Sequence, residues 1–382
     1  MKPASPEALI NPKMLEWVRR QGAYSPDDMA TKAHARLEDY NEWEQGSSRP
    51  TMTQLFRLAH GVHRPLTIFY FDSLPPADAE LPDFRRLPSE SRSELSAEAR
   101  LELRKARERR EEFIALAQQM GALKPGSGDW KFVGSATLQT PLKDLASHAR
   151  SLLGVDWPPL APLSSNHAIF NFWREALERA GILVFQGTIA TDEFRAAAIA
   201  ETPFPVILVS SSDFVLARVF SLLHELGHLL LGESNVSLVV KGGVETEAYC
   251  NRFAAEMLMP EAVFRKDPDV AALTKRTVTR SELRTISRRY GVSMQAAAVR
   301  LCDLKLQSPR LVSVFKGQFE RETEASSGGG NYYATQIAQL GPMLISTTLR
   351  AVESDTITAM DAYRILGVKP GNLEQLRFTL GG

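Results

Sequence analysis

Two histidines and a glutamate within five consecutive residues are the part of the chain best suited to chemistry. His224, Glu225 and His228 lie inside an apolar stretch, residues 214–231, which is long enough for a helix of several turns. Histidines four positions apart on a helix project from one face, so both imidazoles can bind a single metal ion. The pattern therefore predicts a zinc site, and Glu225 lies on the adjacent face, where a general base is needed.

A catalytic zinc takes three protein ligands and keeps a fourth position open for water. The third ligand must come from elsewhere, and Glu245, Glu247 and Glu256 lie in or near the next apolar stretch, residues 247–259. Eighteen residues separate Glu247 from His228, enough for a loop and an antiparallel second helix. We therefore expect Glu247 to be the third ligand.

The other polar residues of this second helix are assigned by their spacing from Glu247. Glu256 lies nine positions further on, about half a turn around the helix, so it cannot face the same ion. We expect it to face solvent or to form an ion pair. Asn251 lies four positions after Glu247, on the same face, and is the expected hydrogen-bond partner that orients a ligand.

Charge and cysteine content exclude several classes of protein. Lys and Arg number 45 and Asp and Glu number 45, so no overall basic field favours nucleic acid or an anionic membrane. Two cysteines, Cys250 and Cys302, cannot form a disulfide framework, and both are expected to be buried small hydrophobic residues of a protein from a reducing compartment.

The chain shows no targeting or membrane signal. Residues 1–9 lack the basic start and apolar core of a signal peptide, so we expect a cytoplasmic protein. The stretch 214–231 contains Arg218 besides the two histidines and Glu225, and charged groups are costly in lipid. We therefore expect a buried helix there and no interaction with a membrane.

Chain length and the breaks in pattern predict an α+β protein of several units. With 382 residues the chain is too long for one average domain. We expect an all-α domain at 1–76, a charged helical linker at 77–125, a central α+β domain at 126–305 with a small sheet, and a helical C-terminal unit at 306–382. Gly- and Pro-rich segments mark the boundaries.

The sequence around the histidines resembles the ImmA/IrrE metallopeptidase family over residues 130–305. The resemblance is carried by Val206 to Val209, Arg218, Phe220, the run from His224 to His228, the run from Glu247 to Pro260, and a last block at 286–301 similar to the helix-turn-helix-like tail of that domain. It implies a zincin-like fold, a Zn²⁺ cofactor and a zinc endopeptidase that cleaves a partner repressor after a stress or mobile-element signal.

The ligand spacing also resembles the wider thermolysin-like pattern, with Asn251 where an aspartate is usual. Peptidases of that type use a further group to stabilise the oxyanion. Tyr249, Arg252, His167 and groups in the C-terminal tail stay open as candidates.

Residues 12–76 resemble the helix-turn-helix of the xenobiotic response element type found in phage repressors. The residues that carry this resemblance include Ser25 to Ala30, Trp43 to Gly46, Pro50, Thr51, Leu55, Leu58 and Ala59. Ser25 is the expected N-cap of a helix with Pro26 in its first position. However, residues 36–44, at the recognition-helix position, hold four acidic residues and one basic residue. Because phosphate contacts need the opposite charge, we expect docking to a protein or within the chain rather than DNA binding.

Three functions remain as hypotheses. The first is a zinc endopeptidase that acts on a transcriptional repressor. The second is a DNA-binding regulator whose peptidase-like domain serves as a sensor or interaction surface. The third, a toxin–antitoxin partner that acts by binding alone, leaves Glu225 without a role. The complete set of His224, Glu225 and His228 favours the first.

Overall fold

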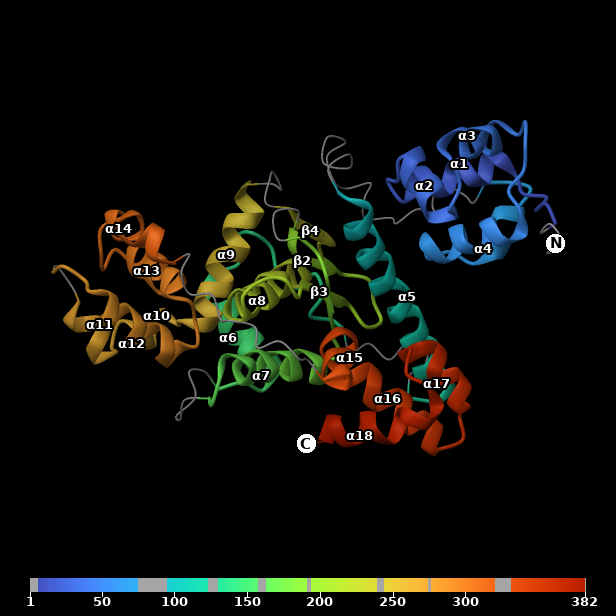
Figure 1. The fold of residues 1–382 in the computed structure, drawn as a ribbon. Helices are drawn as coiled ribbons and strands as arrows, with labels where there is room; N and C mark the ends of the chain where they lie inside the picture. Colours follow the sequence, from blue (N-terminus) through green and yellow to red (C-terminus); the bar gives the residue numbers. More distant parts are fainter. Residues whose placement is uncertain are drawn as a thin grey trace. The chain divides into compact units, whose positions relative to one another are not determined.

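The structure is a computed structural model that describes residues 6–74, 95–122, 130–156, 163–190, 194–238, 244–273, 276–319 and 331–381. The chain divides into two compact units, Met1–Lys105 and Ala106–Gly382 (Figure 1). Each is described by itself. The domain boundaries expected at residues 76 and 125 stay predictions.

The first unit is built from helices packed around one core. They are α1 (Pro12–Gln21), α2 (Pro26–Ala33), α3 (Leu37–Gln45) and α4 (Met52–Gly61), followed by the 3-10 helix η1 (Leu66–Tyr70). Ser25 caps α2 as predicted, because its hydroxyl accepts a hydrogen bond from Asp28 N and the Asp28 carboxylate accepts one from Ser25 N. The assignment to the repressor type of helix-turn-helix stays a prediction.

Helix α5 (Ala97–Gln119) lies within residues 77–125, where a charged helical linker is expected. One of its arginines is buried and binds other parts of the protein. Arg110 is only 4% exposed, and it donates hydrogen bonds to the carbonyl oxygens of Pro203 and Phe204 and pairs with Glu201. The second half of α5 is therefore fixed to the turn before strand β3 (Val206–Ser210).

A four-stranded sheet forms the centre of the second unit, in the order β1-β3-β2-β4. Strand β1 (Leu183–Gly187) is parallel to β3 (Val206–Ser210), and β2 (Phe194–Ile199) is antiparallel to both β3 and β4 (Asn235–Leu238). All five residues of β1 and all five of β3 are buried, and both strands belong to the small sheet expected for this domain. Strand β2, with three consecutive alanines, lacks the β-branched residues that mark a strand in sequence.

Helix α8 (Val215–Leu231) packs against β2 and β3, and α7 (Asn166–Arg179) packs against α8 and β1. Most of α8 is buried, as predicted for residues 214–231. Among the described residues, no helix has the length and apolar character needed to cross a membrane. The described part of the chain is therefore mixed α and β and mostly helical, whereas the zincin-like details stay a prediction.

Helix α9 (Val244–Leu258) crosses α8 closely and also contacts α6 (Leu142–Leu153). Gly227 permits this approach, because a Cβ added there would lie 3.1 Å from Cys250 Sγ and 3.1 Å from Phe253 Cδ1, both on α9. Those distances are shorter than ordinary van der Waals contact. The glycine between the two histidines therefore sets how near α9 comes to them.

The remaining helices follow α9 in two groups. The first holds α10 (Glu261–Phe264), α11 (Pro268–Ala272), α12 (Arg280–Tyr290), α13 (Met294–Asp303) and α14 (Arg310–Phe319), and the second holds α15 (Tyr332–Leu340), α16 (Pro342–Glu353), α17 (Ala359–Leu366), the 3-10 helix η4 (Pro370–Asn372) and α18 (Leu373–Gly381). Helix α15 packs on β1. The second group thus lies in the same compact unit as the sheet, and the C-terminal unit expected at 306–382 stays a prediction.

Candidate metal centre

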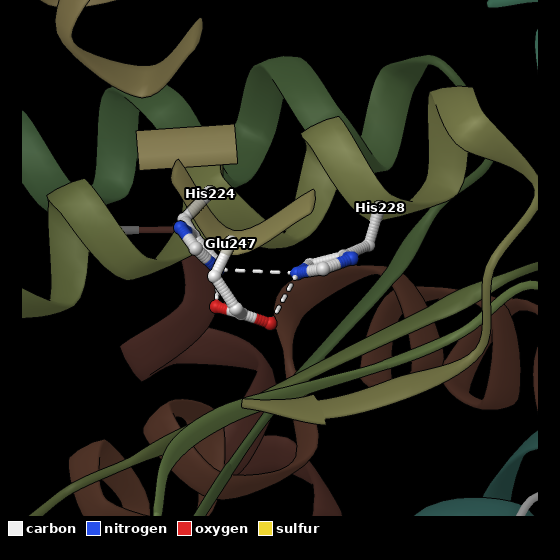
Figure 2. Close-up of side chains that lie close together, drawn as sticks. All are labelled: His224, His228 and Glu247. Atoms are coloured by element: carbon white, nitrogen blue, oxygen red, sulfur yellow. Dashed lines mark hydrogen bonds and ion pairs between the residues drawn. The ribbon is translucent and has the colours of Figure 1, made fainter. Parts of the chain in front are cut away.

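Three side chains from α8 and α9 converge on one point (Figure 2). His224 Nε2 lies 3.1 Å from Glu247 Oε2, and His228 Nε2 lies 3.3 Å from Glu247 Oε1. The two Nε2 atoms are 3.1 Å apart. The structure therefore brings together the two histidines and the glutamate that the sequence analysis selected, with one ligand atom of each within 4.8 Å of the others.

These three donors fit a zinc ion. Zinc bound to nitrogen and oxygen at about 2.0–2.2 Å in a tetrahedron holds its ligand atoms about 3.4 Å apart. This is close to the 3.1 Å between the two Nε2 atoms and to the 3.1 and 3.3 Å from each of them to the nearer Glu247 oxygen. Two histidines and one glutamate also form the donor set of catalytic zinc sites that keep a fourth position open. His228 is fully buried and His224 is 6% exposed. Burial of polar side chains between apolar helices is costly unless they have partners, and a shared metal ion would be such a partner for both histidines.

Residues around the centre orient the two imidazoles. His224 Nδ1 donates a hydrogen bond to Asn251 Oδ1 at 3.0 Å, which orients the ring so that Nε2 points towards Glu247. Asn251 therefore makes the contact expected for it from the sequence. His228 Nδ1 lies 3.7 Å from Glu233 Oε2, on the other side of its ring.

Two residues near the centre were not identified from the sequence. Cys250, expected only as a buried hydrophobic residue, is fully buried and also forms a hydrogen bond with His228. Its position three residues after Glu247 on α9 could have indicated this, because residues three apart lie on the same face of a helix. Glu233 follows the end of α8, and nothing in its local sequence marks it.

The electrostatics of the centre depend on proton sharing between these groups. Burial lowers the pKa of His228, but hydrogen bonds with Cys250, Glu233 and Glu247 outweigh it and raise the pKa well above the usual range. Burial raises the pKa of Glu247, but hydrogen bonds from both histidines outweigh it and hold that pKa far below the usual range. A metal ion competes with protons for the same atoms, so binding is weaker in acid.

Glu225 is fully buried on α8, between the two histidines in sequence. Its charge is one of the factors that raise the pKa of His228, so the carboxylate lies within electrostatic reach of that ring. Its role as general base stays a prediction.

The other candidates lie in different environments. Glu256 is buried and pairs with Arg300, and it also accepts a hydrogen bond from Glu261 N at 3.1 Å, so its carboxylate is used in an ion pair away from the centre. The ion pair is one of the two alternatives expected for it. The Tyr249 hydroxyl donates to the carbonyl oxygen of Thr140 at 2.7 Å.

Two further candidates for oxyanion stabilisation, Arg252 and His167, are on the surface. Arg252 is exposed and donates to the carbonyl oxygen of Ala248, and His167 is exposed in the first turn of α7. These contacts do not select one of the candidates, so the oxyanion-stabilising residue stays a prediction.

Comparison with known families agrees with this geometry. Residues 177–302 match the family model described as the IrrE N-terminal-like domain, Peptidase_M78. The match contains all three candidate ligands together with Glu225 and Asn251. A search of curated proteins finds no match. The matched third of the chain, residues 177–302, is therefore similar to a metallopeptidase domain of the ImmA/IrrE type.

Proposed function

We propose that the protein is a zinc endopeptidase that cleaves a regulatory protein, a partner transcriptional repressor, in a stress or mobile-element response. The observation that carries the catalytic part is the convergence of His224, His228 and Glu247 on one point, with Glu225 on the same helix. The family match to a peptidase domain supports the same conclusion. The repressor substrate and the cytoplasmic location come from the sequence analysis.

The residues divide the chemical work between them. His224 and His228 would hold a zinc ion through Nε2, and Glu247 would hold it through its carboxylate. When bound, zinc supplies Lewis acidity, which polarises a peptide carbonyl and lowers the pKa of water. The Glu225 carboxylate takes a proton from the attacking water, and it then returns that proton to the nitrogen of the leaving amine. Asn251 keeps the His224 ring in the orientation that points Nε2 at the centre.

The first experiment measures metal content. We expect about one zinc per purified chain, and we expect it to be lost when His224, His228 or Glu247 is replaced by alanine, because two remaining ligands hold the ion poorly. Glu245→Ala is the matched control, since Glu245 is an exposed glutamate in the first turn of the same helix. A wild-type chain that takes up no zinc after supplementation would overturn the proposal.

The second experiment separates metal binding from catalysis. Glu225→Gln should keep zinc and the fold but abolish cleavage of a repressor encoded beside this gene, because an amide cannot take a proton from water. Asp213→Asn, which alters a carboxylate before the start of α8 that pairs with Arg195, serves as a control for the loss of a negative charge. Full activity in Glu225→Gln would refute the role given to that residue.

A further inference from the structure

The second ring nitrogen of His228 requires an acceptor that the three metal ligands do not supply. Figure 2 shows one nitrogen of this ring towards Glu247 and the other pointing away from it. The nearer one is Nε2, which lies 3.3 Å from Glu247 Oε1. When a neutral imidazole binds a metal ion through Nε2, its only proton is on Nδ1. Because His228 is fully buried, a group of the protein has to accept a hydrogen bond from that proton.

Two further side chains lie close to this ring. Glu233 Oε2 is 3.7 Å from His228 Nδ1, and Cys250 forms a hydrogen bond with the ring. A thiol sulfur is a weak acceptor, whereas an ionised carboxylate accepts strongly and forms short, charge-assisted hydrogen bonds. The chemistry of the two groups therefore favours Glu233 as the acceptor of the Nδ1 proton.

The distance from Glu233 to the ring can be closed by the glutamate alone. A separation of 3.7 Å is that of an ion pair, whereas a hydrogen bond joins N and O at about 2.9 Å, so a movement of about 0.8 Å is needed. The side chain of Glu233 is 46% exposed, and that of His228 is 0% exposed. The glutamate can therefore adjust its torsion angles at the surface while the surrounding packing holds the imidazole in place.

The backbone holds Glu233 beside the histidine that it faces. Glu233 N donates a hydrogen bond to the carbonyl oxygen of His228 at 2.9 Å. Gly232 permits this turn, because its φ of 71° is in the left-handed region that glycine adopts most easily. A Cβ added to Gly232 would also lie 2.9 Å from the Cα of Gly134, so the turn is packed against a neighbouring segment. The Glu233 carboxylate is therefore attached to a defined backbone position next to the ring.

Helix stability does not explain an acidic residue at this position. The carbonyl groups at the C-terminal end of a helix carry a partial negative charge, which stabilises cations and repels carboxylates. Glu233 follows this end of α8, directly after the cap residue Gly232. A neutral or basic residue would suit the helix better, whereas the contact with His228 gives the carboxylate a role.

We infer that Glu233 is a positioning residue of the metal centre, whose carboxylate accepts a hydrogen bond from His228 Nδ1. This contact fixes the ring and makes Nε2 a stronger donor to a metal ion. Asn251 makes the corresponding contact with His224 through an uncharged amide oxygen. The inference rests on the proposed zinc site and adds to it a residue that contacts neither the metal nor the substrate.

The first measurement is the zinc affinity of the full-length chain, in competition with a chromogenic chelator. Glu233→Ala should bind zinc about 10- to 100-fold more weakly than the wild type, which is the usual effect of losing such a contact. Glu233→Gln should lie between the two, because its amide oxygen still accepts a hydrogen bond but carries no charge. Glu245→Ala removes the same charge from an exposed position in the first turn of α9 and should bind zinc as the wild type does.

The second measurement is a spectroscopic signature that a general loss of stability would not produce. In the zinc-loaded chain with isotope-labelled histidines, the Nδ1 proton of His228 should have a downfield NMR resonance, as expected for a strong hydrogen bond to a carboxylate. Asn251→Ala identifies the corresponding proton of His224, because only that resonance loses its acceptor. The His228 resonance should move upfield in Glu233→Ala and stay in place in Glu245→Ala.

Two results would overturn this inference and leave the proposed function standing. One is a Glu233→Ala variant that binds zinc as tightly as Glu245→Ala does. The other is a His228 resonance that does not move in Glu233→Ala, which would point to Cys250 as the acceptor. A wild type that binds no zinc would overturn the proposed function together with this inference, so the two failures can be told apart.

Discussion

Replacement of Glu178 by glutamine should make the second unit more stable in neutral and alkaline solution. Glu178 lies near the end of α7 and is 8% exposed, and its Oε2 accepts a hydrogen bond from Met343 N in the first turn of α16 at 3.0 Å. The packing there is close, because a Cβ added to Gly341 would lie 2.6 Å from Glu178 Oε1 and 2.6 Å from the Val184 carbonyl oxygen. The carboxyl group thus lies directly between α7 and the C-terminal helices.

The magnitude follows from the pKa of this group. Burial raises the pKa of Glu178 from 4.5 to about 8, although the nearby Arg174 and the hydrogen bond from Met343 oppose the rise. The folded state therefore binds the proton more tightly than the unfolded chain does. Stability is unaffected below about pH 4.5, decreases as the pH rises from 4.5 to 8, and is lower by at most about 5 kcal/mol above that range.

Glutamine reproduces the protonated side chain and cannot ionise. The Tm of Glu178→Gln should therefore equal that of the wild type near pH 4.5 and exceed it by up to about 10 °C near pH 8, because about 1 kcal/mol corresponds to about 2 °C in a unit of this size. Scanning calorimetry at a series of pH values measures this difference. Glu175→Gln, at an exposed position on the same helix, should show no such widening. A Tm difference that does not change with pH would refute the reasoning.

Three further predictions concern the metal centre and the first unit. Asn251→Ala should weaken zinc binding by about 10- to 100-fold in competition with a chelator, because His224 loses the contact that orients it. Gly227→Ala should also raise the dissociation constant for zinc, since the new Cβ pushes on Phe253 and Cys250 and displaces α9; unchanged affinity would contradict the role given to this glycine. A fragment of residues 1–76 should bind duplex DNA weakly or not at all in a salt titration, and submicromolar, sequence-specific binding to the promoter upstream of the gene would support the DNA-binding regulator instead.

Much of the metal centre could be predicted from the sequence because its geometry is local. The positions of His224 and His228 on one helix fix the relation between the two imidazoles, whatever the rest of the fold does. Glu247 and Asn251 are also four positions apart and therefore share one face of a helix. They can be assigned to the centre once a second helix is assumed to run back alongside the first. Glu233 could not be predicted in this way, because its distance to His228 depends on how the chain turns after α8.

The acidic character of α3 shows how far a charge count can be used. The sequence placed Glu38, Asp39, Glu42 and Glu44 towards a DNA backbone. In the structure Glu44 pairs with Arg19 of α1 at 2.8 Å, and Asp39 pairs with Arg36 at 2.6 Å. Two of the four charges are thus engaged within the unit. Glu38 and Glu42 remain exposed. Fewer acidic charges can therefore repel phosphate than the sequence suggests, but those that remain still oppose phosphate contacts.

The C-terminal helices cover strand β1 of the sheet, and this contact could not be predicted from the sequence. Strand β1 lies at one edge of the sheet order, yet all five of its residues are buried. An apolar edge strand exposes unpaired backbone groups and invites association with other chains unless another element covers it. Helix α15 packs on β1, and Met343 N at the start of α16 reaches Glu178 of α7. Strand β1 and helix α15, which covers it, are about 150 positions apart in the sequence. The periodicity of each segment predicts a strand or a helix, but it does not predict that the two are in contact.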